Sequence, residues 1–173
     1  MSMTKNITDK FELLADLGTL KVPAAYDHET QLDSFTKKYR SQFYYYNPSV
    51  TDENFGNPTV RLVPGQMVHV RAFRQMVPET LTSEERMEFL AGQKALLTGA
   101  QGATLVFEQM RDLLPKGYWY VSFDEKAALW SDEAGHGVPI LDAHSVHAFG
   151  LRLGRFSNRW RDVDATLCFC KAG

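Results

Sequence analysis

The segment 164–173, with the sequence DATLCFCKAG, holds the only two cysteines of the chain, Cys168 and Cys170. In an extended strand, residues i and i+2 lie on the same face, so the two thiols would point together while Leu167 and Phe169 point the other way. Cysteine, leucine and phenylalanine are all side chains that proteins bury. The segment therefore predicts a central strand that is covered on both faces.

Two other interpretations of the cysteine pair remain open. A structural zinc site usually has a second pair of ligands at matching spacing, and here those ligands would have to be histidines. A reactive thiol needs a nearby cation. If the turn at 157–163 joins antiparallel neighbours, Cys168 lies opposite either Leu151 or Arg152, and only the arginine would supply that cation. We predict neither a metal site nor a cofactor.

The composition is that of a globular protein. Of the 173 residues, 44% are hydrophobic and 23% are charged, and the formal net charge is -2. A chain of this length buries roughly 70% of its unfolded surface, which fits one domain over residues 1–173. The small net charge gives no overall attraction to nucleic acids or anionic membranes. No run approaches the roughly 20 apolar residues of a membrane helix, so we expect a cytoplasmic protein without membrane contact.

Residues 1–100 are predicted to be rich in helix. Two early helices are indicated by apolar residues spaced three or four apart: Ile7, Phe11, Leu14 and Leu17 in the first, and Leu32, Phe35, Tyr39 and Phe43 in the second. Asp27 could cap the second helix. Thr82 and Glu85 form a capping-box signature that begins a central helix, and Gly99 could end it.

Residues 101–173 are predicted to be rich in strands. Gly99 and Gly102 are interpreted as a connector after the central helix. Short apolar or alternating runs then follow at intervals of about ten residues: ATLVFEQM, GYWYVSF, GVPILDA, AFGLRLGRF and ATLCFC. An earlier strand is indicated by the alternation of Val68, Val70 and Ala72 with polar residues. The predicted fold class is α+β, with N-terminal helices plus one central helix packed on a mostly antiparallel sheet whose C-terminal half is a β-meander.

Two runs of aromatic residues, QFYYYN and GYWYVSF, indicate a binding surface. About half of the rings on an alternating strand face away from the principal core, and tyrosine and tryptophan are enriched in interfaces. We therefore predict a small binding or interaction protein that uses an aromatic-rich sheet face or groove for a small molecule, a protein partner or a second copy in a homodimer. The candidate ligand or interface residues are Tyr44, Tyr46, Tyr118, Trp119, Tyr120 and Trp160.

The segment LRLGRFSNRWRD, residues 151–162, provides an alternative. Phe156 and Trp160 lie among its four arginines. The guanidinium group of arginine binds phosphate and stacks on aromatic rings. Such a pattern suits single-stranded nucleic acid, with Arg152, Arg155, Arg159 and Arg161 as the contacts. The simpler interpretation is that these arginines pair with acidic residues of neighbouring strands, which makes nucleic acid the less favoured partner.

A third hypothesis is an enzyme with a site made of Asp142, His144, His147 and Cys168. It requires these side chains to meet in one pocket. The sequence has no Walker A loop and no GxSxG, HExxH or CxxC motif. Two histidines three residues apart on a strand also face opposite ways. We therefore favour a binding protein and assign no catalytic residues.

Overall fold

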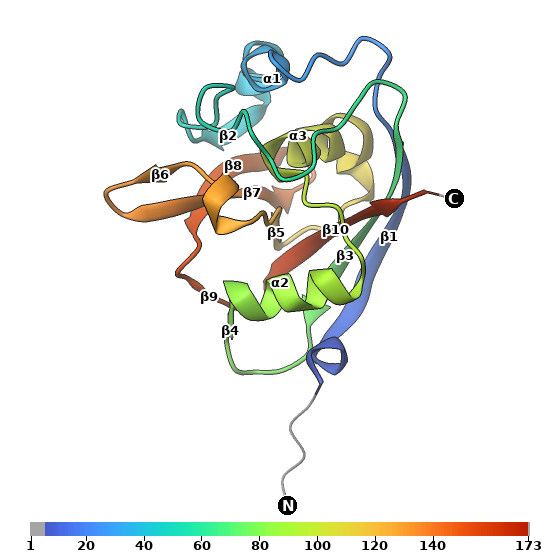
Figure 1. Cartoon of the computed structure of the whole chain (residues 1–173), viewed down its shortest axis with the longest axis vertical. Helices are drawn as coiled ribbons and strands as arrows, with labels where there is room; N and C mark the ends of the chain where they lie inside the picture. Colours follow the sequence, from blue (N-terminus) through green and yellow to red (C-terminus); the bar gives the residue numbers. More distant parts are fainter. Residues whose placement is uncertain (1–5, 173) are drawn as a thin grey trace, which may run out of the picture.

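The computed structural model describes residues 6–172 as an α+β fold with a large, mainly antiparallel sheet (Figure 1). The strands are β1 (Phe11–Lys21), β2 (Phe43–Tyr46), β3 (Met67–Gln75), β4 (Leu81–Thr82), β5 (Tyr118–Val121), β6 (Ser131–Asp132), β7 (Gly135–Ser145), β8 (Ala148–Arg155), β9 (Arg159–Trp160) and β10 (Asp164–Lys171). The helices are α1 (Gln31–Tyr39), α2 (Ser83–Gly92) and α3 (Gly99–Met110), and short 3-10 turns span Ile7–Lys10, Arg40–Gln42, Arg111–Leu113 and Lys126–Ala128.

Strand β10 lies in the middle of the large sheet, as the cysteine segment predicts. The strand order is β1-β3-β10-β5-β7-β8-β2, with β6 paired to β7, while β4 and β9 form a separate two-stranded sheet. Leu167, Cys168 and Phe169 are all buried. The prediction that Cys168 lies opposite Leu151 or Arg152 is wrong, because β10 does not pair with β8. Its antiparallel neighbour is β3, where Arg71 lies opposite Cys168.

The predicted C-terminal meander is therefore only partly formed. Strands β5, β7 and β8 are antiparallel neighbours, but β10 leaves them and runs parallel to β5. The chain between β8 and β10 is not a hairpin turn, because β9 pairs with β4 beside α2. This detour carries the chain across the sheet and lets β10 enter between β3 and β5.

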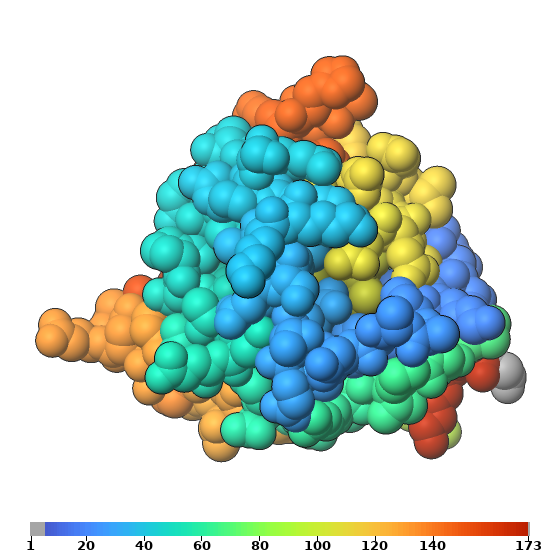
Figure 2. Space-filling view, turned by 90° about the horizontal axis from the view of Figure 1, so that it is seen from above, coloured from blue at the N-terminus to red at the C-terminus, as the bar shows by residue number. Residues whose placement is uncertain are grey.

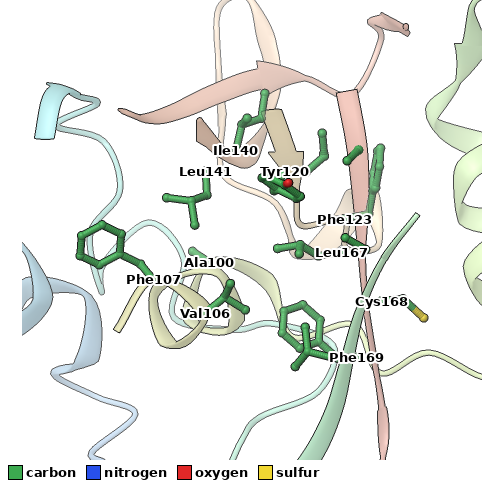
Figure 3. Packing of buried hydrophobic residues seen from close by; sticks show 14 of the residues in the cluster. Ala100, Val106, Phe107, Tyr120, Phe123, Ile140, Leu141, Leu167, Cys168 and Phe169 are labelled. Atoms are coloured by element: carbon green, nitrogen blue, oxygen red, sulfur yellow. The ribbon is translucent and has the colours of Figure 1, made fainter. Parts of the chain in front are cut away.

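The two faces of the sheet are covered by different helices. Leu167 and Phe169 point toward α3, and Figure 3 shows Cys168 on the opposite side of the sheet. On the α3 side, Phe107 packs edge-on against the ring of Phe149, with 5.3 Å between centroids. On the other side, Phe89 of α2 packs against Phe73 at 5.0 Å. Each face thus has its own apolar layer.

The first predicted helix is wrong, because its residues form a four-residue 3-10 turn and the long edge strand β1. Two register shifts interrupt the pairing of β1 with β3, one between Leu13 and Ala15 and one between Asp16 and Gly18. Each bulge adds one residue to the ordinary strand period of two. Gly18 has a φ of 84° at the second bulge, a conformation that glycine adopts at no steric cost. The apolar residues of β1 consequently recur every three residues and imitate a helix.

The segment ATLVFEQM is also predicted wrongly, since it belongs to α3 and not to a strand. Ten residues of this twelve-residue helix are buried, including its polar residues Gln101 and Thr104. A helix that is buried all round shows no polar stripe and therefore no helical period. Gly99 and Gly102, interpreted as a connector, lie within this helix, and Gly102 lets it approach β10 closely.

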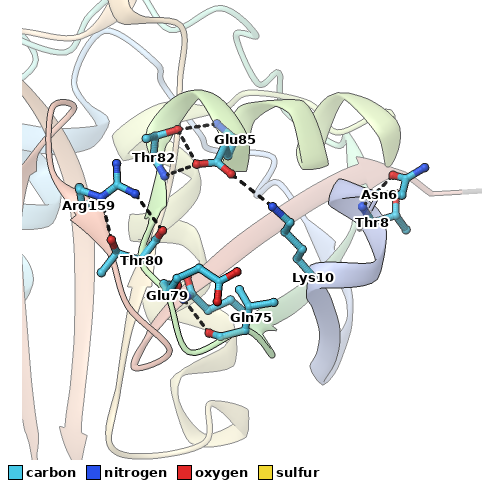
Figure 4. A network of polar contacts seen from close by, with 10 residues as sticks. Asn6, Thr8, Lys10, Gln75, Glu79, Thr80, Thr82, Glu85 and Arg159 are labelled. Carbon is cyan, nitrogen blue, oxygen red and sulfur yellow. Dashed lines mark hydrogen bonds and ion pairs between the residues drawn. The ribbon is translucent and has the colours of Figure 1, made fainter. Parts of the chain in front are cut away.

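The other two helices exist as predicted, but their ends differ. The central helix, α2, ends at Gly92 and not at Gly99, which is the first residue of α3. α2 begins at the expected capping box, in which the Thr82 hydroxyl accepts from the Glu85 backbone N–H and the Glu85 carboxylate accepts from the Thr82 N–H (Figure 4). α1 is shorter than predicted because Phe43 belongs to strand β2. Asp27 does not cap α1. The carboxylate of Asp52 does so instead, by accepting from the backbone N–H groups of Leu32 and Asp33, the second and third residues of the helix, at 2.9 and 3.0 Å.

The guanidinium group of Arg86 connects α2 to the sheet. This side chain is fully buried and donates to the carbonyl oxygen of Asp164, to Thr166 Oγ1 at 2.9 Å and to Gln75 Oε1 at 2.6 Å. It also donates to the carbonyl oxygen of Arg161 at 2.9 Å. Burial lowers the pKa of Arg86 to about 10, so the group stays charged at neutral pH. One side chain therefore joins α2, β3, β10 and the segment that precedes β10.

Replacing Arg86 by methionine tests this connection. We expect Arg86→Met to lower the free energy of unfolding in urea by about 3 kcal/mol, because it leaves several buried acceptors without a donor. Arg61 makes only an exposed ion pair with Glu29, so Arg61→Met serves as the control and should change stability by less than about 0.5 kcal/mol. Equal effects of the two substitutions would contradict the role assigned to Arg86.

A pair of glycine substitutions tests how closely α3 is packed around Gly102. A Cβ atom at Gly102 would collide with Thr98 Oγ1, at the start of the same helix, and would lie 3.0 Å from both Phe169 Cζ of β10 and Thr98 Cβ, whereas a Cβ at Gly92, in α2, would meet nothing within 4 Å. We expect Gly102→Ala to destabilise the protein by about 1–2 kcal/mol through overpacking. Gly92→Ala should stabilise it by up to about 1 kcal/mol through helix propensity. Thermal unfolding of both variants would decide, and a stabilising Gly102→Ala would contradict the close contact.

Candidate functional site

The half of the sheet face that α2 leaves open carries a cluster of polar and aromatic residues. One row of this face runs across four strands, from Trp119 on β5 to Asp142 on β7, Gly150 on β8 and Tyr45 on β2. A Cβ atom at Gly150 would lie 3.3 Å from Asp142 Oδ2 and 3.5 Å from Arg152 Nε. The missing side chain therefore leaves the space into which Arg152 extends.

Arg152 stacks on three aromatic rings. Its guanidinium carbon lies 4.5 Å from the ring centroid of Tyr45, 4.8 Å from that of Trp119 and 5.6 Å from that of Tyr44. A register shift between β2 and β8 makes Tyr44 the extra residue, so that Tyr44 and Tyr45 both reach Arg152. Cation–π contacts of this length are favourable. We call these four residues, together with Asp142, the Arg152 cluster.

Asp142 anchors the cluster from below. Its side chain is 2% exposed, and its Oδ2 accepts from Arg152 Nε at 3.1 Å and from the hydroxyl of Tyr44. Arg152 Nη2 also donates to the Tyr44 oxygen at 3.1 Å. The other carboxylate oxygen, Oδ1, is buried and has no hydrogen-bond partner among residues 6–172. A buried oxygen without a donor is uncommon in native proteins and marks a place that a ligand or water group can complete.

The same contacts shift two pKa values. Burial and the hydrogen bond to Asp142 raise the pKa of the Tyr44 phenol, although Arg152 acts in the opposite direction. For Arg152, partial burial disfavours the charged form, but the hydrogen bonds to Tyr44 and Asp142 outweigh it and raise the pKa of the guanidinium. Tyr44 therefore remains a neutral donor and Arg152 a permanent cation at neutral pH.

A depression of about 390 Å³ adjoins the cluster and is lined by all four arginines of the segment 151–162. We call it the arginine pocket. Its other walls include Tyr45, Trp119, Asn158, Trp160 and Asp164. The aromatic runs and the arginine segment, which the sequence presents as separate hypotheses, therefore meet in one place.

Three of the four arginines contact a carboxylate, as the simpler interpretation of this segment predicts. Arg152 pairs with Asp142, and Arg155 holds both carboxylate oxygens of Asp132 at 2.7 and 3.1 Å. Arg161 is 60% exposed, and its Nε lies 3.6 Å from Asp164 Oδ2.

Arg159 differs from the other three, because no carboxylate within the described range lies at ion-pair distance from it. It donates instead to the hydroxyl and the carbonyl oxygen of Thr80 at 2.7 and 3.2 Å (Figure 4). The arginine pocket therefore keeps positive charge at Arg159, while Asp164 balances part of the charge of Arg161.

The structure divides the six predicted aromatic residues among several places. Tyr46, Tyr120 and Trp160 are buried, and each has its own polar partner inside the protein: Thr36 Oγ1 for Tyr46, the Pro115 carbonyl for Tyr120 and Ser83 Oγ for Trp160. Tyr118 lines a different hollow, where Arg74 donates to its hydroxyl at 3.3 Å. Only Tyr44 and Trp119 belong to the Arg152 cluster.

Sequence reasoning missed Tyr45 and Gly150. Tyr45 belongs to the aromatic run QFYYYN that indicated a binding surface, so the signal was present, but strict alternation on a strand does not select it. Gly150 stands in an alternating apolar run and carries no signal of its own. Its role appears only from the side chains that the neighbouring strands place around it.

The proposed enzyme site is not formed. His144 and His147 are exposed at the β7–β8 turn, which stands out from the surface in Figure 2 (orange, top). Trp119 of β5 lies opposite both Asp142 of β7 and Asp164 of β10, so Asp142 and Asp164 are in one row, two strands apart. Cys168 lies four residues beyond Asp164 along β10. These steps put the Asp142 and Cys168 backbones about 16 Å apart, so the two residues cannot share a direct hydrogen-bonded site.

Comparison of the chain with protein-family models, with curated proteins and with solved structures finds no match. Within residues 6–172, no group of three histidine, cysteine, aspartate or glutamate side chains is placed to hold a metal ion. None of the helices in the same range is long and apolar enough to cross a membrane.

A double-mutant cycle tests whether Asp142 and Arg152 act as a unit. We expect Arg152→Met to lower the free energy of unfolding by about 2–3 kcal/mol, since it leaves the buried Asp142 carboxylate without its cation. Adding Asp142→Asn to that variant removes the unpaired charge and should restore about half of the loss or more. Urea unfolding of the single and double variants measures both quantities, and strictly additive losses would contradict the coupling.

Proposed function

We propose that the protein is a binding protein whose arginine pocket takes a small anionic ligand that carries a flat ring, the combination found in a mononucleotide. The observation that carries this proposal is the convergence of four arginines with Trp119 and Tyr45 around one depression of about 390 Å³. This volume falls within the range of roughly 300–1,000 Å³ that small-molecule pockets occupy.

The charge of the pocket supports an anionic ligand. Asp142 and Asp132 engage Arg152 and Arg155. Arg161 contacts Asp164 only through Nε, at 3.6 Å, and is 60% exposed, while Arg159 donates to Thr80, so Arg161 and Arg159 keep N–H donors for a ligand. Arginine binds phosphate and carboxylate groups through parallel N–H donors. Arg159 and Arg161 are therefore the side chains that we assign to the anionic group.

The Arg152 cluster supports a flat ring. Tyr45 is 41% exposed, Trp119 is partly exposed, and the guanidinium carbon of Arg152 lies over both rings. Aromatic rings and arginine planes are surfaces on which nucleobases stack. Because Asp142 and Tyr44 already hold Arg152 in place, little side-chain freedom would be lost when a ligand ring stacks on it.

Isothermal titration calorimetry with three probes tests the proposal. Adenosine monophosphate carries both recognised groups, adenosine carries only the ring, and ribose 5-phosphate carries only the anion. We expect adenosine monophosphate to bind at low salt and each half-ligand to bind at least about tenfold more weakly, a loss of roughly 1.4 kcal/mol. Absence of binding by all three probes would overturn the proposal.

Two substitutions test whether adenosine monophosphate binds in the arginine pocket. Trp119→Ala and Arg161→Gln should each weaken binding of adenosine monophosphate about tenfold, and Arg161→Gln should also reduce the dependence on salt. Arg74→Gln is the matched control, because Arg74 is an exposed arginine in the separate hollow beside Glu12 and Tyr118. Loss of binding in the control, or full binding in both pocket variants, would place the ligand elsewhere.

A single-stranded oligonucleotide in the same titration addresses the alternative partner. If it binds much more tightly than the mononucleotide, the arginine pocket is one part of a longer nucleic-acid surface. Self-association as a homodimer and a cytoplasmic location remain predictions from the sequence.

A further inference from the structure

The end of β10 opposite the arginine pocket holds a second hollow, about 550 Å³ in volume, with Cys170 in its wall. Among residues 6–172, three cations line it and no carboxylate does: Arg71 of β3, Lys94 of the α2–α3 connection and Lys171 of β10. We call it the Cys170 pocket. It shares no lining residue with the arginine pocket, so an inference about it is independent of the proposed function.

Cys170 is the accessible member of the thiol pair. Its sulfur lies 3.7 Å from that of Cys168, and Arg71 Nη2 lies 3.9 Å from it. Cys168 is fully buried, whereas Cys170 is partly exposed. Burial, reinforced by the neighbouring Cys170, raises the pKa of Cys168 to about 12, so that Cys168 keeps its proton at neutral pH. Cys168 can therefore donate its S–H toward Cys170, and Arg71 can donate an N–H. The Cys170 thiol itself donates to the Gln93 carbonyl oxygen at 3.5 Å, a contact that is lost when the thiol gives up its proton.

The charged residues that line the Cys170 pocket favour the approach of negatively charged reagents. His69 lies opposite Cys170 on β3 and is bound at 2.6 Å by Asp16, the nearest carboxylate on β1. Asp16 keeps its negative charge and lies near Arg71, but it does not line the Cys170 pocket, whose charged residues within 6–172 are all positive. A thiol in such surroundings attracts reagents that are negatively charged.

We propose that Cys170 is a modification site, at which a small disulfide that carries carboxylates enters the Cys170 pocket and forms a mixed disulfide with the protein. The pocket supplies the three cations for the carboxylates, and Arg71 and Cys168 supply hydrogen bonds to the attacking sulfur.

The reaction is a thiol–disulfide exchange. Cys170 first gives its proton to solvent, and its sulfur then attacks one sulfur of the reagent. The bond between Cys170 and that sulfur forms as the disulfide bond of the reagent breaks, and the second sulfur leaves with the electron pair and takes up a proton. The reagent is the oxidant: Cys170 is oxidised, and the departing half is reduced to a free thiol.

The fold opposes a second exchange that would join Cys168 to Cys170. Residues i and i+2 of an extended strand have Cα atoms about 6.7 Å apart, at the far end of the range that disulfides span. The backbone of β10 is held at this spacing by its pairing with β3 through Lys171. We therefore expect the mixed disulfide to persist as a single adduct on Cys170.

A matched pair of reagents tests the charge requirement. Glutathione disulfide and cystamine both react through a disulfide bond, but the first is anionic and the second is cationic. With the reduced native protein at low salt, we expect one glutathionyl group by mass spectrometry, located on Cys170 by peptide mapping. The rate at which glutathione disulfide modifies the protein is divided by the rate for cystamine. We expect this ratio to be about tenfold higher in native protein than in urea-unfolded protein. At high salt, the ratio for native protein should fall toward that for unfolded protein. An equal ratio in the two states, or an adduct on Cys168, would overturn the proposal.

Variants separate the thiol from the cations. Cys170→Ser should abolish the adduct, and Cys168→Ala should retain it. Lys94→Asn and Lys171→Gln together should slow the glutathione disulfide reaction at least about threefold without slowing cystamine; asparagine is chosen because Lys94 has a φ of 57°, which asparagine tolerates. Lys37→Gln, on α1, is the control. Unchanged rates in the double variant would contradict the role of the cations.

Discussion

The hydrogen bonds of the buried Arg86 guanidinium group are the interaction on which the placement of α2 against the sheet, and with it the arginine pocket, depends. Arg86 donates to acceptors on β3, on β10 and in the segment before β10, and thereby fixes how α2, β9 and β10 lie relative to one another. A buried cation destabilises the folded state unless hydrogen-bond acceptors surround it, so the acceptors of Arg86 must all be in position. The detour of the chain through β9 follows from this requirement, because the Arg161 carbonyl is one of the acceptors.

This arrangement leaves one part of the sheet face uncovered. α2 and the β4–β9 pair cover the face over β3 and β10, while the rows that contain Trp119 and Tyr45 stay accessible. Gly150 then leaves space for the Arg152 side chain, whose guanidinium carbon lies over both rings. The arginine pocket thus lies where the layer formed by α2 and the β4–β9 pair ends. Its four arginines belong to the segment 151–162, and Arg86 binds the carbonyl oxygen of Arg161 in that segment.

Elements with a local signal could be predicted from the sequence, and those shaped by distant partners could not. The capping box of Thr82 and Glu85 and the alternation in β3 act within a few residues, and both were found. Two bulges gave β1 a false helical period, and burial on all sides removed the period of α3. The arginines and Trp119 were recognised as candidates. Their convergence with Tyr45 depends on two parallel strand pairings, β2 with β8 and β5 with β10, that no local pattern encodes.

The claim that Trp119 and Arg152 form a ligand-binding surface is tested most directly by nuclear magnetic resonance of side-chain N–H groups. On titration with adenosine monophosphate, the indole signal of Trp119 and the Nε signal of Arg152 should shift together and saturate at one concentration. The signals of Trp130, outside the arginine pocket, and of Arg86, buried beneath α2, should stay in place. Saturable binding that shifts Trp130 or Arg86 and leaves Trp119 and Arg152 unchanged would contradict the account.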